Sequence, residues 1–278
     1  MKSTSEWLCG ETRPRVLCVG GIDPTGASGL VADLRALHSL GVYGSVAVTA
    51  TTAQTSVAVS EVLPVSASLV EAQMEAALKE PGVDVMKTGM LVSEDTVGAV
   101  ERVLLGAQGV RLVLDPVLLS TSGRRLLSTD GMNELRQKLI PRAALVTPNL
   151  PELAALTGRG ESLSGLDIEA AGEELLLLGA GAVFIKGGHS GDEERVVDLL
   201  MTADGDRHII ERSRRKGSFR GTGCTLASAI AGYLAEGRTL SGAVSRARDY
   251  LEAAMDAPPL TGLGAFLLPG VVSPSSPM

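Results

Sequence analysis

Residues 15–40 read RVLCVGGIDPTGASGLVADLRALHSL, and this stretch decides the fold. The apolar run at 15–20 predicts a short buried strand, and the glycine-rich segment at 20–29 predicts a loop. Apolar residues at helical spacing over 28–40 then predict an amphipathic helix. A strand, a loop and a helix in this order form the first half of a βαβ unit, which indicates an α/β protein with a largely parallel sheet.

The same alternation continues along the chain. Further strands are predicted at 45–49, 83–87, 111–115, 144–147, 182–186 and 196–201. Further helices are predicted at 68–79, 94–105, 131–139, 166–178, 225–235 and 240–256. Because no internal repeat or composition break divides the chain, we expect one domain over residues 15–270, with a flexible extension at 1–14 and a disordered tail at 271–278.

The composition argues against several classes of partner. A net charge of −7 and only three Phe, one Trp and three Tyr leave neither a basic stripe nor a stacking platform for nucleic acid, and no attraction to an anionic membrane. The apolar run at 15–20 is also too short to span a bilayer. Cys9, Cys18 and Cys224 are far apart, so neither a disulfide framework nor a zinc site is indicated, and we expect a cytoplasmic protein.

Clusters of glycine, polar and acidic residues follow the ends of the predicted strands. They lie at 20–29, 51–54, 87–90, 115–117, 147–152 and 186–189. Ligands of an open parallel sheet bind beyond the carboxyl ends of its strands, which all lie at one edge. The sequence therefore predicts that these six segments form a single site.

Residues 220–225, RGTGCT, lead into an apolar helix. Glycines before a helix leave backbone N–H groups free to bind an anion, although an ordinary turn capped by Thr225 would have the same sequence. Neither a P-loop nor a G-x-G-x-x-G fingerprint is present, which argues against both of those nucleotide-binding classes. A helix start tends to lower a thiol pKa, so Cys224 could accept a proton; a small buried side chain is the alternative.

Four other polar residues also have two interpretations each. Lys186 ends an apolar strand, where it could neutralise a phosphate or simply extend into water. Asn149 and Glu152 could cap a helix together, or Glu152 could hold hydrated Mg²⁺. Asp33, one turn into the first helix, could bind a ligand or only complement the helix dipole.

Seven motifs occur in the order GGIDPTGASGLVADL, TTAQ, KTGML, DPV, TPNLPE, KGGH and GTGCTLASAIA. Together they resemble, over residues 15–256, the hydroxymethylpyrimidine/phosphomethylpyrimidine kinases of thiamin biosynthesis, which belong to the ribokinase superfamily. The resemblance implies a three-layer αβα ribokinase-like fold, with a mostly parallel central sheet flanked by helices. It also implies Mg²⁺, ATP as the phosphoryl donor, and a homodimer.

The resemblance further implies a role for each matching residue. The substrate pocket would consist of Gly21, Asp33, Gln54, Met90 and Val117, of which Asp33 and Gln54 would hydrogen-bond the aminopyrimidine. The anion hole would consist of Gly221, Thr222 and Gly223, and the catalytic groups would be Cys224 and Lys186. ATP would contact Asn149, Lys186 and Gly223, and the metal would lie near Glu152 and Asp115.

Two positions depart from the family pattern: Arg220 stands where the family typically has His, and Thr121 where it usually has Lys. The implied function is that of an ATP-dependent kinase acting on 4-amino-5-hydroxymethyl-2-methylpyrimidine (HMP) and then on HMP phosphate. Two alternatives stay open. A pyridoxine/pyridoxal kinase is disfavoured by the amide of Gln54, and a non-catalytic pyrimidine sensor is disfavoured by Lys186, Glu152 and residues 221–224.

Overall fold

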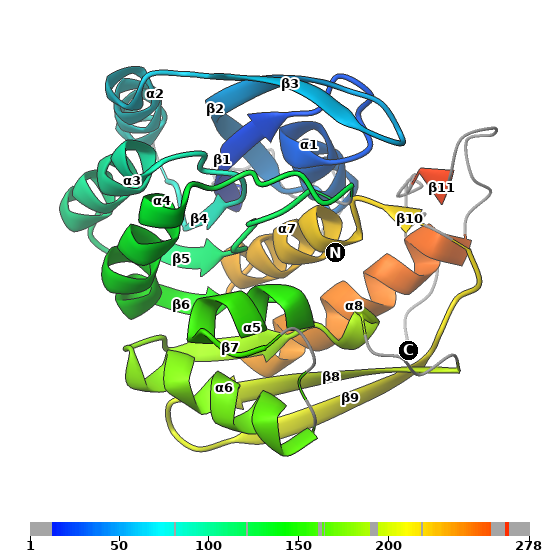
Figure 1. The fold of residues 1–278 in the computed structure, drawn as a ribbon. Coiled ribbons are helices and arrows are strands. Elements are labelled where there is room, and N and C mark those ends of the chain that lie inside the picture. The colour runs from blue at the N-terminus through cyan, green and yellow to red at the C-terminus, as the bar shows by residue number, and fades with distance from the viewer. Residues whose placement is uncertain are drawn as a thin grey trace.

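A nine-stranded sheet forms the middle layer of the part of the chain that the structure describes (Figure 1). The structure is a computed structural model, and it describes residues 13–80, 82–120, 122–160, 163, 165–189, 194–217, 219–256 and 265–266. In spatial order the strands are β3 (Val59–Pro64), β2 (Tyr43–Gln54), β1 (Arg15–Ile22), β4 (Val85–Thr88), β5 (Arg111–Leu114), β6 (Ala143–Val146), β7 (Ala182–Ile185), β8 (Arg195–Thr202) and β9 (Arg207–Ser213). A separate short pair is formed by β10 (Phe219–Arg220) and β11 (Ala265–Phe266).

The central strands of the sheet are parallel. Every pairing from β2 through β1, β4, β5 and β6 to β7 is parallel, whereas β3, β8 and β9 pair antiparallel. The predicted α/β fold, with a mostly parallel sheet flanked by helices, is therefore confirmed. Because the central strands run the same way, their carboxyl ends lie together at one edge of the sheet.

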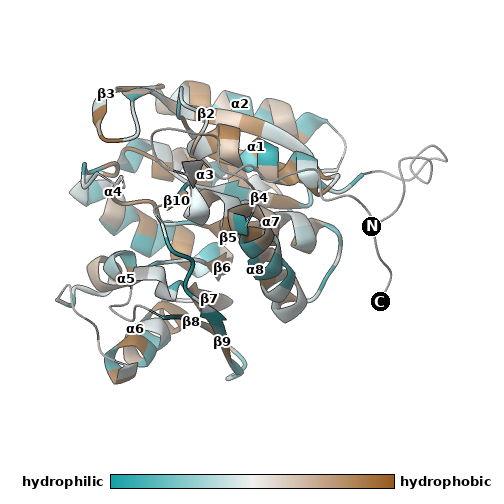
Figure 2. Cartoon of the chain, turned by 90° about the vertical axis from the view of Figure 1, so that its right-hand side faces the viewer, coloured by the Kyte–Doolittle hydropathy of each residue, from teal (hydrophilic) through white to brown (hydrophobic). Residues whose placement is uncertain are grey.

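Each face of the sheet carries its own apolar core. Successive residues of β1 alternate between the two, so that Val16 and Cys18 belong to one core and Leu17 and Val19 to the other. Helices α1 (Gly29–Ser39), α7 (Thr222–Ala235) and α8 (Leu240–Asp256) cover the first face. The second face is covered by α2 (Ala67–Lys79), α3 (Glu94–Gly106), α4 (Thr129–Glu134), α5 (Leu150–Thr157) and α6 (Gly165–Leu177). In Figure 2, α2 alternates between hydrophilic and hydrophobic residues, as a helix with one buried side does.

Several boundaries differ from those predicted. The helix predicted at 131–139 is α4 followed by one π-helical turn, η2 (Leu135–Leu139), and a short 3-10 helix, η3 (Ile140–Arg142). Strand β2 continues to Gln54 because β3 pairs with its last residues, so TTAQ ends a strand instead of following one. Strands β3 and β9 were not predicted, because both are edge strands with mostly exposed residues.

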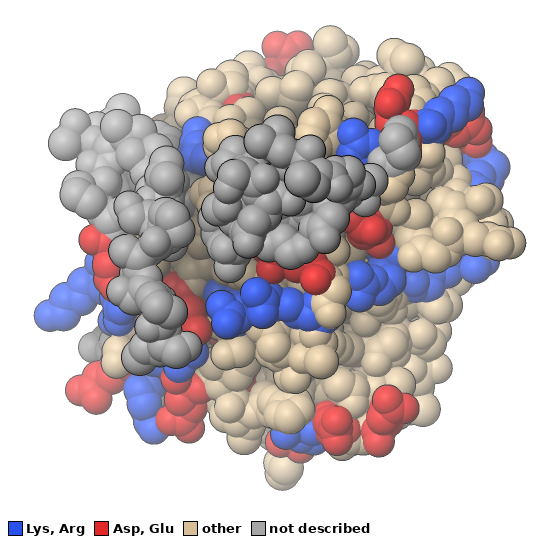
Figure 3. Space-filling model, turned by 180° about the vertical axis from the view of Figure 1, so that it is seen from behind, with Lys and Arg blue, Asp and Glu red and all other residues tan. Residues whose placement is uncertain are grey.

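The chain ends lie largely beyond the described residues. Of the predicted extension at 1–14 only Arg13 and Pro14 are described, and the predicted tail at 271–278 lies outside the described residues. Among the helices that are described, none has the length and apolar character needed to cross a membrane. On the face shown in Figure 3, a band of basic side chains lies beside acidic ones.

Candidate active site

A pocket of about 780 Å³ lies at the carboxyl edge of the parallel strands. Each of the six predicted segments, together with the start of α7, contributes residues to its wall. The prediction that these segments converge on one edge of the sheet is therefore confirmed, and the roles of their residues stay predictions. The pocket brings together all of the predicted site residues, namely Gly21, Asp33, Gln54, Met90, Val117, Asp115, Asn149, Glu152, Lys186, Gly221, Thr222, Gly223 and Cys224.

Helix α7 begins at the floor of this pocket, three residues before its predicted start. Gly221 is the N-cap with a φ of 75°, and its carbonyl accepts the first helical hydrogen bond, from Thr225, at 2.9 Å. A Cβ at position 221 would collide with the carbonyl oxygen of Ala27, so only glycine fits here. The first N–H groups of a helix have no partner inside it, and those of α7 adjoin the pocket, as an anion hole requires.

The thiol of Cys224 lies in the first turn of α7. Burial raises its pKa to about 11; the ammonium of Lys87 opposes this shift, while the carboxylates of Asp33 and Asp115 add to it. The expectation that the helix start lowers this pKa is therefore wrong. Burial and two nearby carboxylates outweigh the helix dipole, so the free protein holds Cys224 as a thiol at neutral pH.

Lys186 follows β7 and is held at the pocket wall by two carboxylates. Its Nζ lies 2.8 Å from Asp115 Oδ1 and 3.9 Å from Glu152 Oε2, and 13% of its side chain is exposed. Burial lowers its pKa, but Asp115 and Glu152 outweigh burial, so the pKa lies above the usual lysine value. Thr147 donates a further hydrogen bond to Asp115 at 3.1 Å. Lys186 is therefore a charged ammonium at the pocket, as its position at a strand end predicted.

Asn149 and Glu152 form the capping box that begins α5. The Asn149 side chain accepts from the Glu152 N–H at 2.8 Å, and Glu152 accepts from the Asn149 N–H at 2.9 Å. Burial raises the pKa of Glu152 to about 7, and Asp115 adds to this shift while Lys186 opposes it. The capping interpretation is confirmed. The described residues contain no group of three His, Cys, Asp or Glu side chains that could hold a metal ion by themselves.

Asp33 has a partner that the sequence analysis missed. Lys87, at the end of β4, places its Nζ 2.9 and 3.0 Å from the two carboxylate oxygens, and the Ser228 hydroxyl donates to Oδ1 at 2.8 Å. Both side chains of the ion pair are only 1% exposed. Asp33 thus borders the pocket as one partner of a buried ion pair, and its contact with an aminopyrimidine stays a prediction. Lys87 could have been found, since it ends a buried strand before Thr-Gly as Lys186 does before Gly-Gly.

The opposite side of the pocket is less polar. Gln54 is the half-buried last residue of β2, and Met90 is 9% exposed with its carbonyl oxygen accepting from Thr49 at 2.6 Å. A Cβ at Gly21 would lie 3.0 Å from the Met90 sulfur, so a glycine here leaves room for that side chain. This side can hold one small ring between an amide and apolar atoms.

A charged lysine, a helix N-terminus and buried carboxylates around one pocket at a parallel sheet edge define a small-molecule phosphotransferase. A model of the phosphomethylpyrimidine kinase family matches residues 23–267. The chain therefore belongs to the phosphomethylpyrimidine kinase family.

Individual relatives agree with this assignment. The hydroxymethylpyrimidine/phosphomethylpyrimidine kinase of Rhizobium meliloti (strain 1021) is 40% identical over 241 residues, which cover 87% of this chain and 90% of the relative. The thiamine biosynthesis bifunctional protein of Geobacter sulfurreducens is 40% identical over 245 residues, 87% of this chain and 49% of that protein. Among solved structures, the pyridoxal kinase of Staphylococcus aureus in complex with pyridoxal has a TM-score of 0.85 at 28% identity, covering 95% of this chain and 96% of that one.

Proposed function

We propose that this chain transfers the γ-phosphoryl group of ATP to the hydroxymethyl oxygen of HMP, and then adds a second phosphate to HMP phosphate. One observation carries the proposal: a single pocket joins Lys186 and the first turn of α7 to a small-ring side formed by Gln54 and Met90. The first part suits a phosphate chain and the second suits an acceptor of one ring. The name of the Rhizobium relative, which aligns along 87% of this chain, supports the same reaction.

Positioning and charge neutralisation are what this site would supply. A phosphoryl group passes through a loose transition state whose charge lies on the equatorial oxygens, so donors aimed at those oxygens lower the barrier. Lys186 and the N–H groups of residues 222–224 are such donors. The loose transition state also means that the acceptor hydroxyl needs no strong base early in the reaction. Cys224 already holds its own proton as a thiol at neutral pH, so it would position the acceptor hydroxyl, whose proton would pass to an oxygen of the transferred phosphoryl group as the new P–O bond forms and the bond to ADP breaks.

The carboxylates beside Lys186 are suited to magnesium bound through water. Mg²⁺ commonly uses one or two carboxylates together with waters and substrate phosphates. Asp115 and Glu152 both border the pocket, although each already accepts a hydrogen bond. These two residues would hold the ion, which would neutralise charge on the phosphates of ATP. The homodimer stays a prediction from the family resemblance, and the cytoplasmic location stays a prediction from the cysteine pattern.

A pyridoxal kinase is the second candidate, because the Staphylococcus structure is similar along almost the whole chain. The test is to mix the purified protein and Mg-ATP with HMP, HMP phosphate or pyridoxal, and to measure ADP release and product mass. We expect much faster turnover of HMP than of pyridoxal, with masses showing one and then two added phosphates. A reaction without acceptor gives the background. Equal or faster turnover of pyridoxal would overturn the substrate assignment, and no turnover of any acceptor would favour a sensor.

A further inference from the structure

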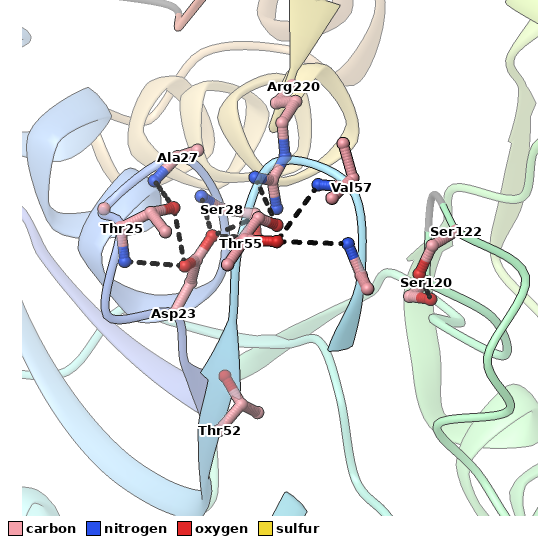
Figure 4. A network of polar contacts seen from close by, with 12 residues as sticks. Asp23, Thr25, Ala27, Ser28, Thr52, Thr55, Val57, Ser120, Ser122 and Arg220 are labelled. Carbon is pink, nitrogen blue, oxygen red and sulfur yellow. Dashed lines mark hydrogen bonds and ion pairs between the residues drawn. The ribbon is translucent and has the colours of Figure 1, made fainter. Parts of the chain in front are cut away.

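Arg220 joins three segments that line the pocket (Figure 4). It is the last residue of β10 and stands directly before Gly221, the N-cap of α7. Its Nη1 donates to the carbonyl oxygen of Thr55 at 2.9 Å, and its Nη2 lies 3.6 Å from Asp23 Oδ2. Only 10% of the side chain is exposed. One guanidinium therefore links the start of α7 to the end of β2 and to the loop after β1.

Asp23 is a rigid anchor for this guanidinium. Its Oδ1 accepts from the N–H and the hydroxyl of Thr25 at 2.8 and 2.7 Å. Its Oδ2 accepts from the N–H and the hydroxyl of Ser28 at 3.0 and 2.8 Å. The carboxylate is thus fixed by its own loop, without help from Arg220. It serves to orient the guanidinium, whose planar fork then reaches the Thr55 carbonyl in a defined direction.

The tip of the β2–β3 hairpin, residues 55–58, is by contrast a small exposed turn. The N–H of Thr55 donates to Ala58 at 2.8 Å, and the Thr55 hydroxyl accepts from the N–H groups of Val57 and Ala58 at 3.3 Å. These bonds hold the turn together internally, and Val57 is 78% exposed. On the β3 side of the turn, Arg124 donates to the carbonyl oxygen of Val59 at 2.8 Å. The bond from Arg220 enters the backbone at Thr55, the residue next to Gln54.

We propose that Arg220 is a positioning residue for the acceptor: by holding the Thr55 carbonyl against the Asp23 loop, it fixes Gln54 relative to the start of α7. The acceptor ring and the phosphoryl group thereby keep a fixed position relative to each other. This inference rests on the proposed function, because it assigns the Gln54 side of the pocket to a small ring with hydrogen-bonding groups. It predicts that loss of the guanidinium weakens acceptor binding more than ATP binding.

The test compares Arg220→Met, which removes the donors and the charge, with Arg220→Lys, which keeps the charge but loses the fork. We expect the KM for HMP to rise about 10-fold or more in the first variant and less in the second, since a hydrogen bond from a charged group is lost or loosened. The KM for ATP should change less than twofold. A purely structural role would lower the melting temperature and kcat together, and would not separate the two KM values.

The matched control is Arg111→Met. Like Arg220, Arg111 donates a guanidinium N–H to a backbone carbonyl. Its acceptor is the carbonyl oxygen of Leu234, at 2.5 Å, near the end of α7 that is far from the pocket. Its loss should leave both KM values unchanged. Hydrogen exchange of the ligand-free proteins gives a second measurement: amides of residues 52–60 should exchange faster in Arg220→Met than in Arg111→Met. If Arg220→Met does not fold, the test rests on the KM for HMP and the exchange of the amides of residues 52–60 in Arg220→Lys.

The outcomes separate this inference from the proposed function. Suppose that the wild-type protein phosphorylates HMP, and that the Arg220 variants show the wild-type KM for HMP and the wild-type exchange rate of the hairpin amides. The positioning role is then wrong, and the proposed function stands. If the wild type phosphorylates no HMP, the proposed function is wrong. Faster hairpin exchange in Arg220→Met, without HMP turnover by the wild type, would keep the link to the hairpin but overturn its role for this acceptor.

Discussion

Two lysine–aspartate pairs lie at the ends of parallel strands, and they differ in what surrounds them. Lys87 and Asp33 are each 1% exposed, and the Ser228 hydroxyl also donates to that carboxylate. Lys186 is 13% exposed, and its pair with Asp115 borders the pocket. Both pairs border the pocket, so the same side-chain pairing occurs once with an almost fully buried ammonium and once with a partly exposed one.

This difference teaches which charge is available for chemistry. An ammonium held on two carboxylate oxygens in a closed environment cannot turn to a ligand without leaving a buried carboxylate unpaired. Lys186 instead contacts one oxygen of Asp115 at 2.8 Å and lies 3.9 Å from Glu152, so its remaining N–H groups can reach a phosphate. We therefore propose a structural role for Lys87 and a phosphate-binding role for Lys186. The following predictions test this division.

The largest expected effect is the loss of stability in Lys87→Met. Removing the ammonium leaves the Asp33 carboxylate buried with only Ser228 as a partner, which should cost about 3 to 5 kcal/mol of the free energy of unfolding. Denaturant unfolding followed by circular dichroism measures this. The control is Lys138→Met, which removes a half-exposed pair with Glu134 and should cost far less stability. Equal losses in the two variants would contradict a structural role for Lys87.

Lys186→Met should reduce activity more than stability. Loss of a preorganised charge that stabilises the transferring phosphoryl group should lower kcat by about 10²-fold to 10³-fold. Asp115 keeps its hydrogen bond from Thr147 and the favourable charge of Lys87, and the Lys186 side chain is partly exposed, so the loss of stability should be smaller than in Lys87→Met. Steady-state kinetics with HMP and unfolding of the same sample give both quantities. A normal kcat with a large loss of stability would reverse the two roles.

A smaller effect concerns Cys224, because charges from both pairs act on its thiol. With a pKa of about 11, the thiolate fraction should rise about tenfold for each pH unit between 7 and 10. The rate of iodoacetamide alkylation at Cys224, followed by peptide mass spectrometry, should rise in the same way, because the thiolate is the reactive form. A Cys9→Ser background avoids reaction at the N-terminal cysteine. A rate that levels off below pH 9 would show a stabilised thiolate and contradict the raised pKa.

The fold was predictable where periodicity is strong. The helix predicted at 240–256 is α8, Leu240–Asp256, because its buried side repeats over seventeen residues. Strand β9 was missed because its sequence, RHIIERS, has charged residues on an edge strand that is mostly exposed. Strand β3 was missed for the same reason and ends in a proline. Edge strands bury little surface, so their sequences retain little of the apolar alternation that identifies a strand.

The sequence predicted which residues line the pocket better than it predicted which of them contact each other. Strand order alone places the loops after parallel strands at one edge, so the residues of the pocket followed from the pattern. The ion pair of Asp33 with Lys87 joins residues 54 positions apart and depends on β4 lying beside β1, which the chain order does not specify. The pKa shift of Cys224 was predicted with the wrong sign because it depends on burial, and burial depends on packing over α7 and β1.

The close approach between Gly221 and the Ala27 carbonyl has a consequence for engineering the acceptor range of this enzyme. Positions such as 54 and 117 present side chains to the pocket, so randomised libraries there can sample new acceptors while the backbone stays in place. Position 221 offers no such choice, since any added side chain would push the loop after β1 away from the start of α7. A library that spares this one codon will retain more folded members at no loss of useful diversity.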